Sequence, residues 1–122
     1  MKTLIRTALL IAGFCLLACG TESINRDNIC SGSQSCDFAC PIGGCDFECR
    51  DSSSCDATCE GGGCTQVCLD GADCEFSCTG ANCLQQCSDD ANCQMACPGG
   101  DCQQIHNSTG SCTSTCTGGG CT

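Results

Sequence analysis

The sequence contains no tryptophan and no tyrosine, and only four of its 122 residues are phenylalanine. Large aromatic side chains supply much of the buried area in a conventional domain. A small chain that lacks them cannot bury enough apolar surface to offset the entropy lost on folding. These absences therefore predict a fold that is stabilised by something other than a hydrophobic core.

Positive charge is also scarce, because four lysine and arginine residues stand against 14 aspartate and glutamate residues. Removal of residues 1–18, which are typical of a signal peptide as described below, takes away Lys2 and Arg6. The chain from Cys19 then keeps two cations and all 14 acids, a net charge of −12. Phosphate backbones and anionic headgroups are repelled by such a surface. We therefore expect no nucleic-acid partner.

Cysteine is abundant, with 21 residues in the chain. This fraction is far above what a reducing cytosol usually holds, and it predicts an oxidising compartment and a framework of disulfides. Thiolate metal storage is the alternative, since reduced cysteines bind soft ions. The CxC and CxxC spacings typical of such proteins do not occur in the repeat, and an export signal argues against it.

The N-terminal residues are typical of an exported protein. Lys2 and Arg6 are followed by an apolar run over residues 8–18, which suits a signal peptide and is too short to span a bilayer. The run ends in Leu16-Leu17-Ala18-Cys19, which resembles the lipobox of bacterial lipoproteins. The resemblance implies cleavage before Cys19, a diacylglyceryl thioether on its sulfur and a further acyl chain, such as palmitate, on its amino group.

The resemblance also implies an address. Several acyl chains give stable membrane anchoring, and Gly20, which is not Asp, implies sorting to the outer membrane. Cleavage after Gly20 is the alternative and would leave a soluble secreted protein. The predicted organisation is a signal peptide over residues 1–18, a lipidated cysteine with a tether over residues 19–29, and a cysteine-rich repeat domain over residues 30–122.

From Cys30 onward the chain is an internal repeat with a period of 19 residues. Five-residue CxxxC blocks alternate with connectors of four and five residues for nearly five periods. The blocks suit strands better than helices, and the connectors are rich in turn residues. Each short connector ends in a residue that tolerates a left-handed backbone: Gly44, Gly63, Asn82, Asp101 and Gly120.

Two strands and two turns per period predict an all-β fold, a narrow two-sheeted β-solenoid of about five turns. Alternation places both cysteines and the middle residue of each block inside. The middle residues are Phe38, Phe47, Ala57, Gln66, Phe76, Gln85, Met95, Gln104 and Ser114, and we expect the three glutamines to form an amide ladder. The construction resembles disulfide-braced solenoids such as the beetle antifreeze proteins. An irregular disulfide-rich fold is the alternative.

Strand geometry predicts how the cysteines pair. Cysteines four apart in one strand lie roughly 13 Å from each other, beyond the ~7 Å limit on Cα separation, so bridges must join strands connected by a turn. The predicted pairs are Cys30–Cys36, Cys40–Cys45, Cys49–Cys55, Cys59–Cys64, Cys68–Cys74, Cys78–Cys83, Cys87–Cys93, Cys97–Cys102 and Cys116–Cys121.

His106, the one histidine of the chain, occupies a position where the 19-residue period places a cysteine. Its predicted partner across the turn, Cys112, therefore has no cysteine to bridge. We expect a free thiol at Cys112 near His106. Imidazolium can activate a thiol, but loss of one redundant bridge explains the same residues, and two ligands are too few for structural zinc.

The outward positions give weaker indications of function. Asp37, Asp56 and Glu75 stack along one edge, and with Asp51, Asp70 and Asp89 they could hold calcium, although a solvated acidic face is the preferred interpretation. Ice binding ranks last, because only Thr113 and Thr115 form the threonine pair of ice-binding solenoids.

No nucleophile, base and orienting group form a catalytic set. We therefore predict a non-catalytic structural or interaction module, with no catalytic residue, cofactor or metal. Its predicted contacts are the membrane, through the lipid anchor, and an unidentified protein or surface polymer.

Overall fold

The structure is a computed structural model that describes residues 27–122. These residues form ten β-strands and no helix. None of them therefore forms a helix that could cross a membrane. The strands alternate between two sheets. The first sheet contains β1 (Asp27–Cys30), β3 (Asp46–Cys49), β5 (Thr65–Cys68), β7 (Leu84–Ser88) and β9 (Gln103–Asn107). The second contains β2 (Ser35–Cys40), β4 (Ser54–Cys59), β6 (Asp73–Cys78), β8 (Asn92–Ala96) and β10 (Cys112–Thr115).

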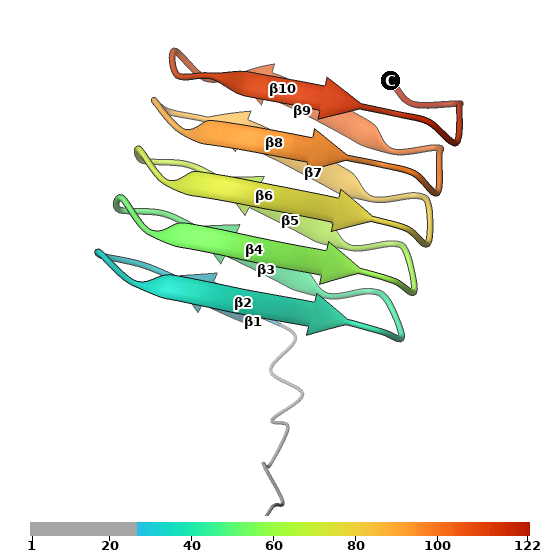
Figure 1. The fold of residues 1–122 in the computed structure, drawn as a ribbon, viewed down its shortest axis with the longest axis horizontal. Coiled ribbons are helices and arrows are strands. Elements are labelled where there is room, and N and C mark those ends of the chain that lie inside the picture. Colours follow the sequence, from blue (N-terminus) through green and yellow to red (C-terminus); the bar gives the residue numbers. More distant parts are fainter. Residues whose placement is uncertain (1–26) are drawn as a thin grey trace, which may run out of the picture.

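All strand pairs are parallel, and each residue pairs with the residue 19 positions away. Cys36 pairs with Cys55 and Cys55 with Cys74, for example, without a shift of register. The chain therefore climbs one turn per repeat, and the two sheets face each other along the whole stack (Figure 1). The predicted all-β, two-sheeted β-solenoid of about five turns is confirmed.

The solenoid begins before the first cysteine of the repeat. β1 starts at Asp27 and pairs with β3, so Asp27, Asn28 and Ile29 belong to the first sheet and not to the predicted tether. The 19-residue period does predict this strand, because Asp27 aligns with Asp46 and Cys30 with Cys49. A CxxxC block that ends at Cys30 would begin with cysteine at residue 26, but this residue is arginine. The cysteine spacing alone therefore does not predict this strand. The signal peptide, Cys19 and the rest of the predicted tether lie outside the described residues.

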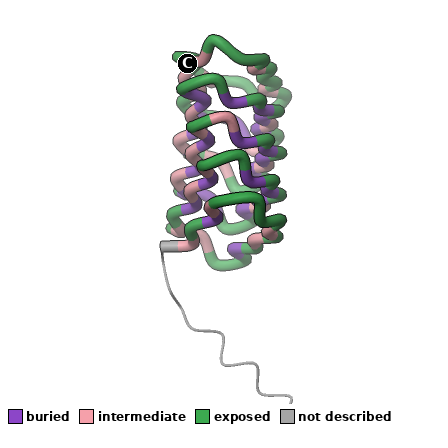
Figure 2. Tube along the Cα trace, turned by 90° about the vertical axis from the view of Figure 1, so that its left-hand side faces the viewer, coloured by how far each residue is buried: buried purple, intermediate pink, exposed green. Residues whose placement is uncertain are grey.

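The interior is a narrow column of cysteines and middle residues between the two sheets. Figure 2 shows buried residues alternating with exposed ones along the strands. Phe47, Phe76 and Met95 are at least 98% buried, whereas Phe38 is half-buried and Ser114 is exposed. Phe38 stacks on Phe47 with ring centroids 5.3 Å apart. Phe38 and Ser114 are more exposed because they lie in the first and last strands of their sheet.

The three glutamines form the predicted amide ladder. Gln85 Nε2 donates to Gln66 Oε1 over 2.9 Å, and Gln104 Nε2 donates to Gln85 Oε1 over 2.8 Å. The second amide hydrogen of Gln85 reaches the carbonyl of Ala96 in the opposite sheet over 3.0 Å. Gln66 reaches the carbonyl of Ala57 in the same way, over 2.9 Å. The ladder thus links successive turns and also bridges the two sheets.

The short turns confirm the predicted left-handed residues. The last residue of every short connector has a positive φ, from 53° at Asp101 to 71° at Gly44 and Gly120. The second residue is glycine in every short turn except the first, where Ile42 occupies the position and is 83% exposed. A Cβ on Gly80 would meet Gly62 N and Glu60 O of the turn beneath it. The stacking of turns therefore requires glycine wherever another turn lies below.

Three of the five long turns share one backbone pattern. In the second, third and fourth long turns two successive residues have positive φ, as at Asp70 (53°) and Gly71 (72°). The fourth residue of each of these turns, Ser53, Ala72 or Ala91, is buried and donates its amide to the carbonyl of the first. None of residues 107–111, the turn between β9 and β10, has a positive φ. The turn next to His106 therefore has a different backbone.

Candidate functional site

The cysteines form bridges along both edges of the solenoid. The structure contains bridges at eight of the nine pairs expected from the sequence. At the ninth pair, Cys87 and Cys93, the sulfurs are also in contact, but Cys87 shares this contact with a third cysteine. The Cα atoms of all nine pairs are 6.1 to 6.3 Å apart. Five-residue separations close the short turns and six-residue separations close the long ones. Each bridge links one sheet to the other at the place where a connector reverses the chain, so neither sheet can slide relative to the other.

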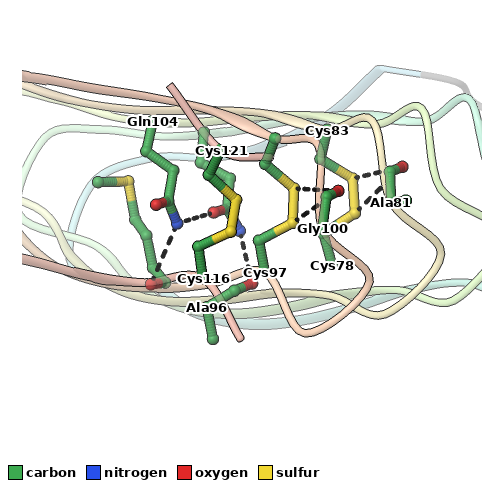
Figure 3. Close-up of a disulfide and its surroundings, with 12 residues drawn as sticks. Cys78, Ala81, Cys83, Ala96, Cys97, Gly100, Gln104, Cys116 and Cys121 are labelled. Carbon is green, nitrogen blue, oxygen red and sulfur yellow. Dashed lines mark hydrogen bonds between the residues drawn. A yellow bond between two sulfur atoms is a disulfide. The ribbon is translucent and has the colours of Figure 1, made fainter. Parts of the chain in front are cut away.

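Backbone oxygens face the sulfurs of the short-turn bridges. Gly100 O lies 3.2 Å from Cys97 Sγ and 3.6 Å from Cys102 Sγ, and Ala81 O makes the same contacts with the bridge one turn below (Figure 3). A sulfur in a disulfide carries no hydrogen, so these are sulfur–oxygen contacts rather than hydrogen bonds. They show that each turn folds back over its own bridge.

Three cysteines come together beside the last two long turns. Cys87 Sγ lies in bonding contact with the sulfurs of both Cys93 and Cys112, and all three sulfurs lie within 4.8 Å of one another. The Cα of Cys87 is 6.1 Å from that of Cys93 and 6.4 Å from that of Cys112. Both separations are ordinary for a disulfide. We call Cys87, Cys93 and Cys112 the three-sulfur group.

The three-sulfur group differs from the prediction of a free Cys112 thiol beside His106. Cys112 contacts Cys87 and Ala91 O, whereas His106 is exposed on β9 in register with Cys87. Because His106 offers no sulfur, Cys112 lies against the next available one, which belongs to the turn below. The sequence period identified the cysteine without a partner, but it could not show that Cys87 lies equally near to Cys93 and Cys112.

A groove runs over the outer face of the second sheet. It has a volume of about 540 Å³ and lies between two rows of outward side chains, one of them Ser54, Asp73, Asn92 and Ser111 and the other Asp56, Glu75, Gln94 and Thr113. Cys55, Cys74 and Cys93 form its floor. Asn92 Nδ2 donates to Asp73 Oδ1 over 2.9 Å, which fixes part of one wall. The groove is acidic because Asp56, Asp73 and Glu75 line it, and one of its walls lies where the long turns end and the strands of the second sheet begin.

The acidic residues of the predicted cation site do not converge. Asp37, Asp56 and Glu75 stack in register along the second sheet, whereas Asp51, Asp70 and Asp89 lie in the long turns. Asp51 is paired with Arg50 over 3.6 Å. Within residues 27–122 no three carboxylates bring their oxygens within 4.8 Å of one another. A calcium ion, which takes six to eight oxygens, finds no preformed cluster in this part of the chain.

The rows that would bind ice are chemically mixed. Thr113 stacks on Gln94, and Thr115 stacks on Ala96. In the row of Thr113 and Gln94, the earlier turns carry the acidic residues Glu75, Asp56 and Asp37. In the row of Thr115 and Ala96, they carry Ser77, Thr58 and Ala39. The regular threonine array of ice-binding solenoids is thus limited to the last turn.

Cysteine sulfurs form further groups of three along both edges, for example Cys68, Cys74 and Cys93 on the long-turn side. These groups arise because bridges in successive turns stack on one another. A disulfide sulfur is not a thiolate and is a poor ligand for soft metals. The stacked bridges therefore do not form metal sites while they remain oxidised.

The predicted lipidation site, Cys19, lies outside the described residues. For the repeat domain, the geometry comprises a stack of bridged turns, an acidic groove and the three-sulfur group. The chain matches no protein-family model, no curated protein and no solved structure.

Proposed function

We propose that the protein is an exported lipoprotein that displays a rigid, acidic and non-catalytic β-solenoid at the surface of the bacterial outer membrane. The observation that carries the proposal is the presence of a bridge at almost every turn of the stack. Disulfides at this density form and persist outside the cytoplasm. Rigidity follows because each bridge fixes the separation of the two sheets at a turn.

The outer faces of the solenoid support an interaction role. The acidic groove on the second sheet lies on bridged strands, so its shape is set before a partner arrives, and a preformed surface binds at lower entropic cost. Its carboxylates favour a cationic or hydroxyl-rich partner, such as a basic protein segment or a surface polymer. The same charge disfavours nucleic acid.

The lipid anchor rests on the Leu16-Leu17-Ala18-Cys19 sequence and on the apolar run before it. In this proposal Cys19 carries the lipid, and residues 20–26 separate it from β1. Secretion as a soluble protein is the alternative, and the two differ in whether acyl chains are attached at Cys19.

The test is acylation in a Gram-negative host. The full chain, the Cys19→Ser variant and the Cys15→Ser variant are expressed with an alkyne-tagged palmitate, and the label is followed by gel and by intact mass. The Cys15→Ser variant is the matched control, because it also removes a cysteine of the leader but leaves the lipobox unchanged. We expect label and outer-membrane fractionation for the wild type and for Cys15→Ser, and loss of both for Cys19→Ser. An unlabelled wild-type protein in the soluble fraction would contradict the anchor.

A further inference from the structure

The cysteine count leaves one thiol over in the repeat domain. Of the 21 cysteines, 19 lie in residues 30–122, which is an odd number. The count rests on the proposed function, in which Cys15 leaves with the signal peptide and the Cys19 sulfur carries lipid, so neither bridges to the repeat. Eight bridges account for 16 of these, and the three-sulfur group holds the other three. A sulfur forms one disulfide at a time, so Cys87 can bond to Cys93 or to Cys112 but not to both.

The backbone favours neither partner. Cys93 and Cys112 are neighbours in register on β8 and β10, and Cys87 faces both from the opposite sheet. Its Cα separations from them, 6.1 and 6.4 Å, lie within the range of unstrained bridges. The sulfurs of Cys87 and Cys112 also share contact with Ala91 O, at 3.7 and 3.9 Å. Either bridge therefore forms without movement of a strand.

We propose that the three-sulfur group is a thiol–disulfide exchange site in which Cys87 alternates between Cys93 and Cys112. The Cys112 thiolate attacks Cys87 Sγ, a Cys87–Cys112 bond forms, and the Cys87–Cys93 bond breaks with its electron pair on Cys93 Sγ. Cys93 takes up the proton that Cys112 released. No sulfur is oxidised or reduced overall, so the exchange needs no other reactant.

The two states differ in what they present to solvent. With the Cys87–Cys93 bridge, the thiol is on Cys112, which is only partly buried on the last strand. With the Cys87–Cys112 bridge, the thiol is on Cys93, which is 3% exposed on the floor of the acidic groove. In the first state the Cys112 thiolate can attack a small soluble disulfide, form a mixed disulfide with one half of it and release the other half as a thiolate. In the second state the thiol is protected and the last turn is tied to the turn below.

The site depends on His106. His106 is in register with Cys87, and Cys112 is in register with Cys93, so positions 106 and 112 are related as Cys87 and Cys93 are. A cysteine at position 106 would therefore bridge Cys112 and leave Cys87 to Cys93 alone. His106→Cys is the matched variant, because it removes the spare thiol without removing any cysteine.

The experiment locates the free thiol by mapping peptides of the oxidised full chain. One sample is denatured at mildly acidic pH, where few thiols are ionised and exchange stops, and is alkylated at once with N-ethylmaleimide. A second sample is first treated in its native state at neutral pH with dithiobis(nitrobenzoate), a small aromatic disulfide, until labelling ceases. Cleavage before Asp89 and before Asp101 places Cys87, Cys93 and Cys112 on three segments, which the Cys97–Cys102 bridge and the Cys87 bridge still join. Tandem mass spectrometry of the linked segments without reduction places the label. Cys15 and Cys19 are on other peptides.

We expect the quenched sample to carry label on both Cys93 and Cys112 and none on Cys87. We expect the three-sulfur group of the native sample to carry close to one label per chain, all of it on Cys112, because exchange moves the thiol from the buried to the accessible position. His106→Cys should show a single Cys87–Cys93 bridge and no label at these positions. A quenched label confined to one cysteine would overturn the proposal. So would a native label that stops at the fraction already on Cys112, because the two states would then not interconvert.

Discussion

At the scale of single residues, the interior is stabilised by sulfur and by amides more than by hydrocarbon. Gln66 and Gln85 are fully buried, and such polar side chains are costly inside a protein unless their hydrogen bonds are made. Here each amide donates to a neighbour in the ladder or to a carbonyl of the opposite sheet. The ladder therefore replaces the large apolar side chains that the composition lacks.

Removal of the central member of the ladder should be costly. We predict that Gln85→Leu lowers the free energy of unfolding by about 1–3 kcal/mol, because Gln66 Oε1 and Ala96 O lose a buried donor. Guanidinium unfolding of the oxidised protein, followed by far-ultraviolet circular dichroism, measures the change. Gln94→Leu is the control, since Gln94 is exposed on β8, and it should shift the midpoint little. Equal losses for the two variants would show that the ladder does not stabilise the fold.

At the scale of elements, the short turns set how closely successive strands can stack. Their second residue must leave room for the turn beneath, which explains why Gly61, Gly80, Gly99 and Gly118 occupy this position while Ile42 is allowed in the first turn. The requirement arises from contact between turns and not from backbone conformation, because Gly80 has no positive φ.

A methyl group at this position should therefore separate two turns. We predict that Gly80→Ala destabilises the protein by more than about 3 kcal/mol, because the new Cβ would overlap Gly62 N and Glu60 O. The two turns can move apart only by losing backbone hydrogen bonds between successive turns. Gly44→Ala is the control, because its φ is 71° but its Cβ would meet nothing within 4 Å. It should lose only about 1–2 kcal/mol, from the left-handed backbone. Thermal unfolding compares the two variants, and a larger loss for Gly44→Ala would contradict the role of close stacking.

Strands, turns and inward residues were predictable from the sequence because every one of them repeats with the same period. Exceptions to the period were harder to predict. β1 was missed because Arg26 stands where the block would begin with cysteine. The three-sulfur group was missed because sequence spacing relates Cys112 to position 106, whereas its contact with Cys87 depends on how far the chain climbs in one turn. The acidic groove was foreseen only as a row of carboxylates, since its second wall comes from the ends of the long turns.

At the scale of the whole molecule, the bridges hold the structure together. Each short loop closed by a disulfide restricts the unfolded chain, and the contribution is roughly 2 kcal/mol per bridge in the chain-entropy model. The apolar interior is only a few side chains wide and cannot substitute for these contributions.

Reduction should therefore unfold the repeat domain. We predict that a strong reductant abolishes the β-sheet signal in circular dichroism and expands the chain in gel filtration, at a temperature where the oxidised protein keeps both properties. Reduced and alkylated protein serves as the reference for the unfolded state. A reduced chain that stays compact and β-rich would show that the ladder and the turns are sufficient for folding.

The separation of inward from outward positions has a consequence for how the surface can change. Bridges, ladder and turn glycines account for the stability, and none of them lies in the outward rows of either sheet. Those rows are therefore free to take other residues, turn by turn, while the scaffold stays the same. The solenoid therefore holds its outward positions at fixed spacings. The five successive side chains of one row can be substituted to change the surface without changing the fold.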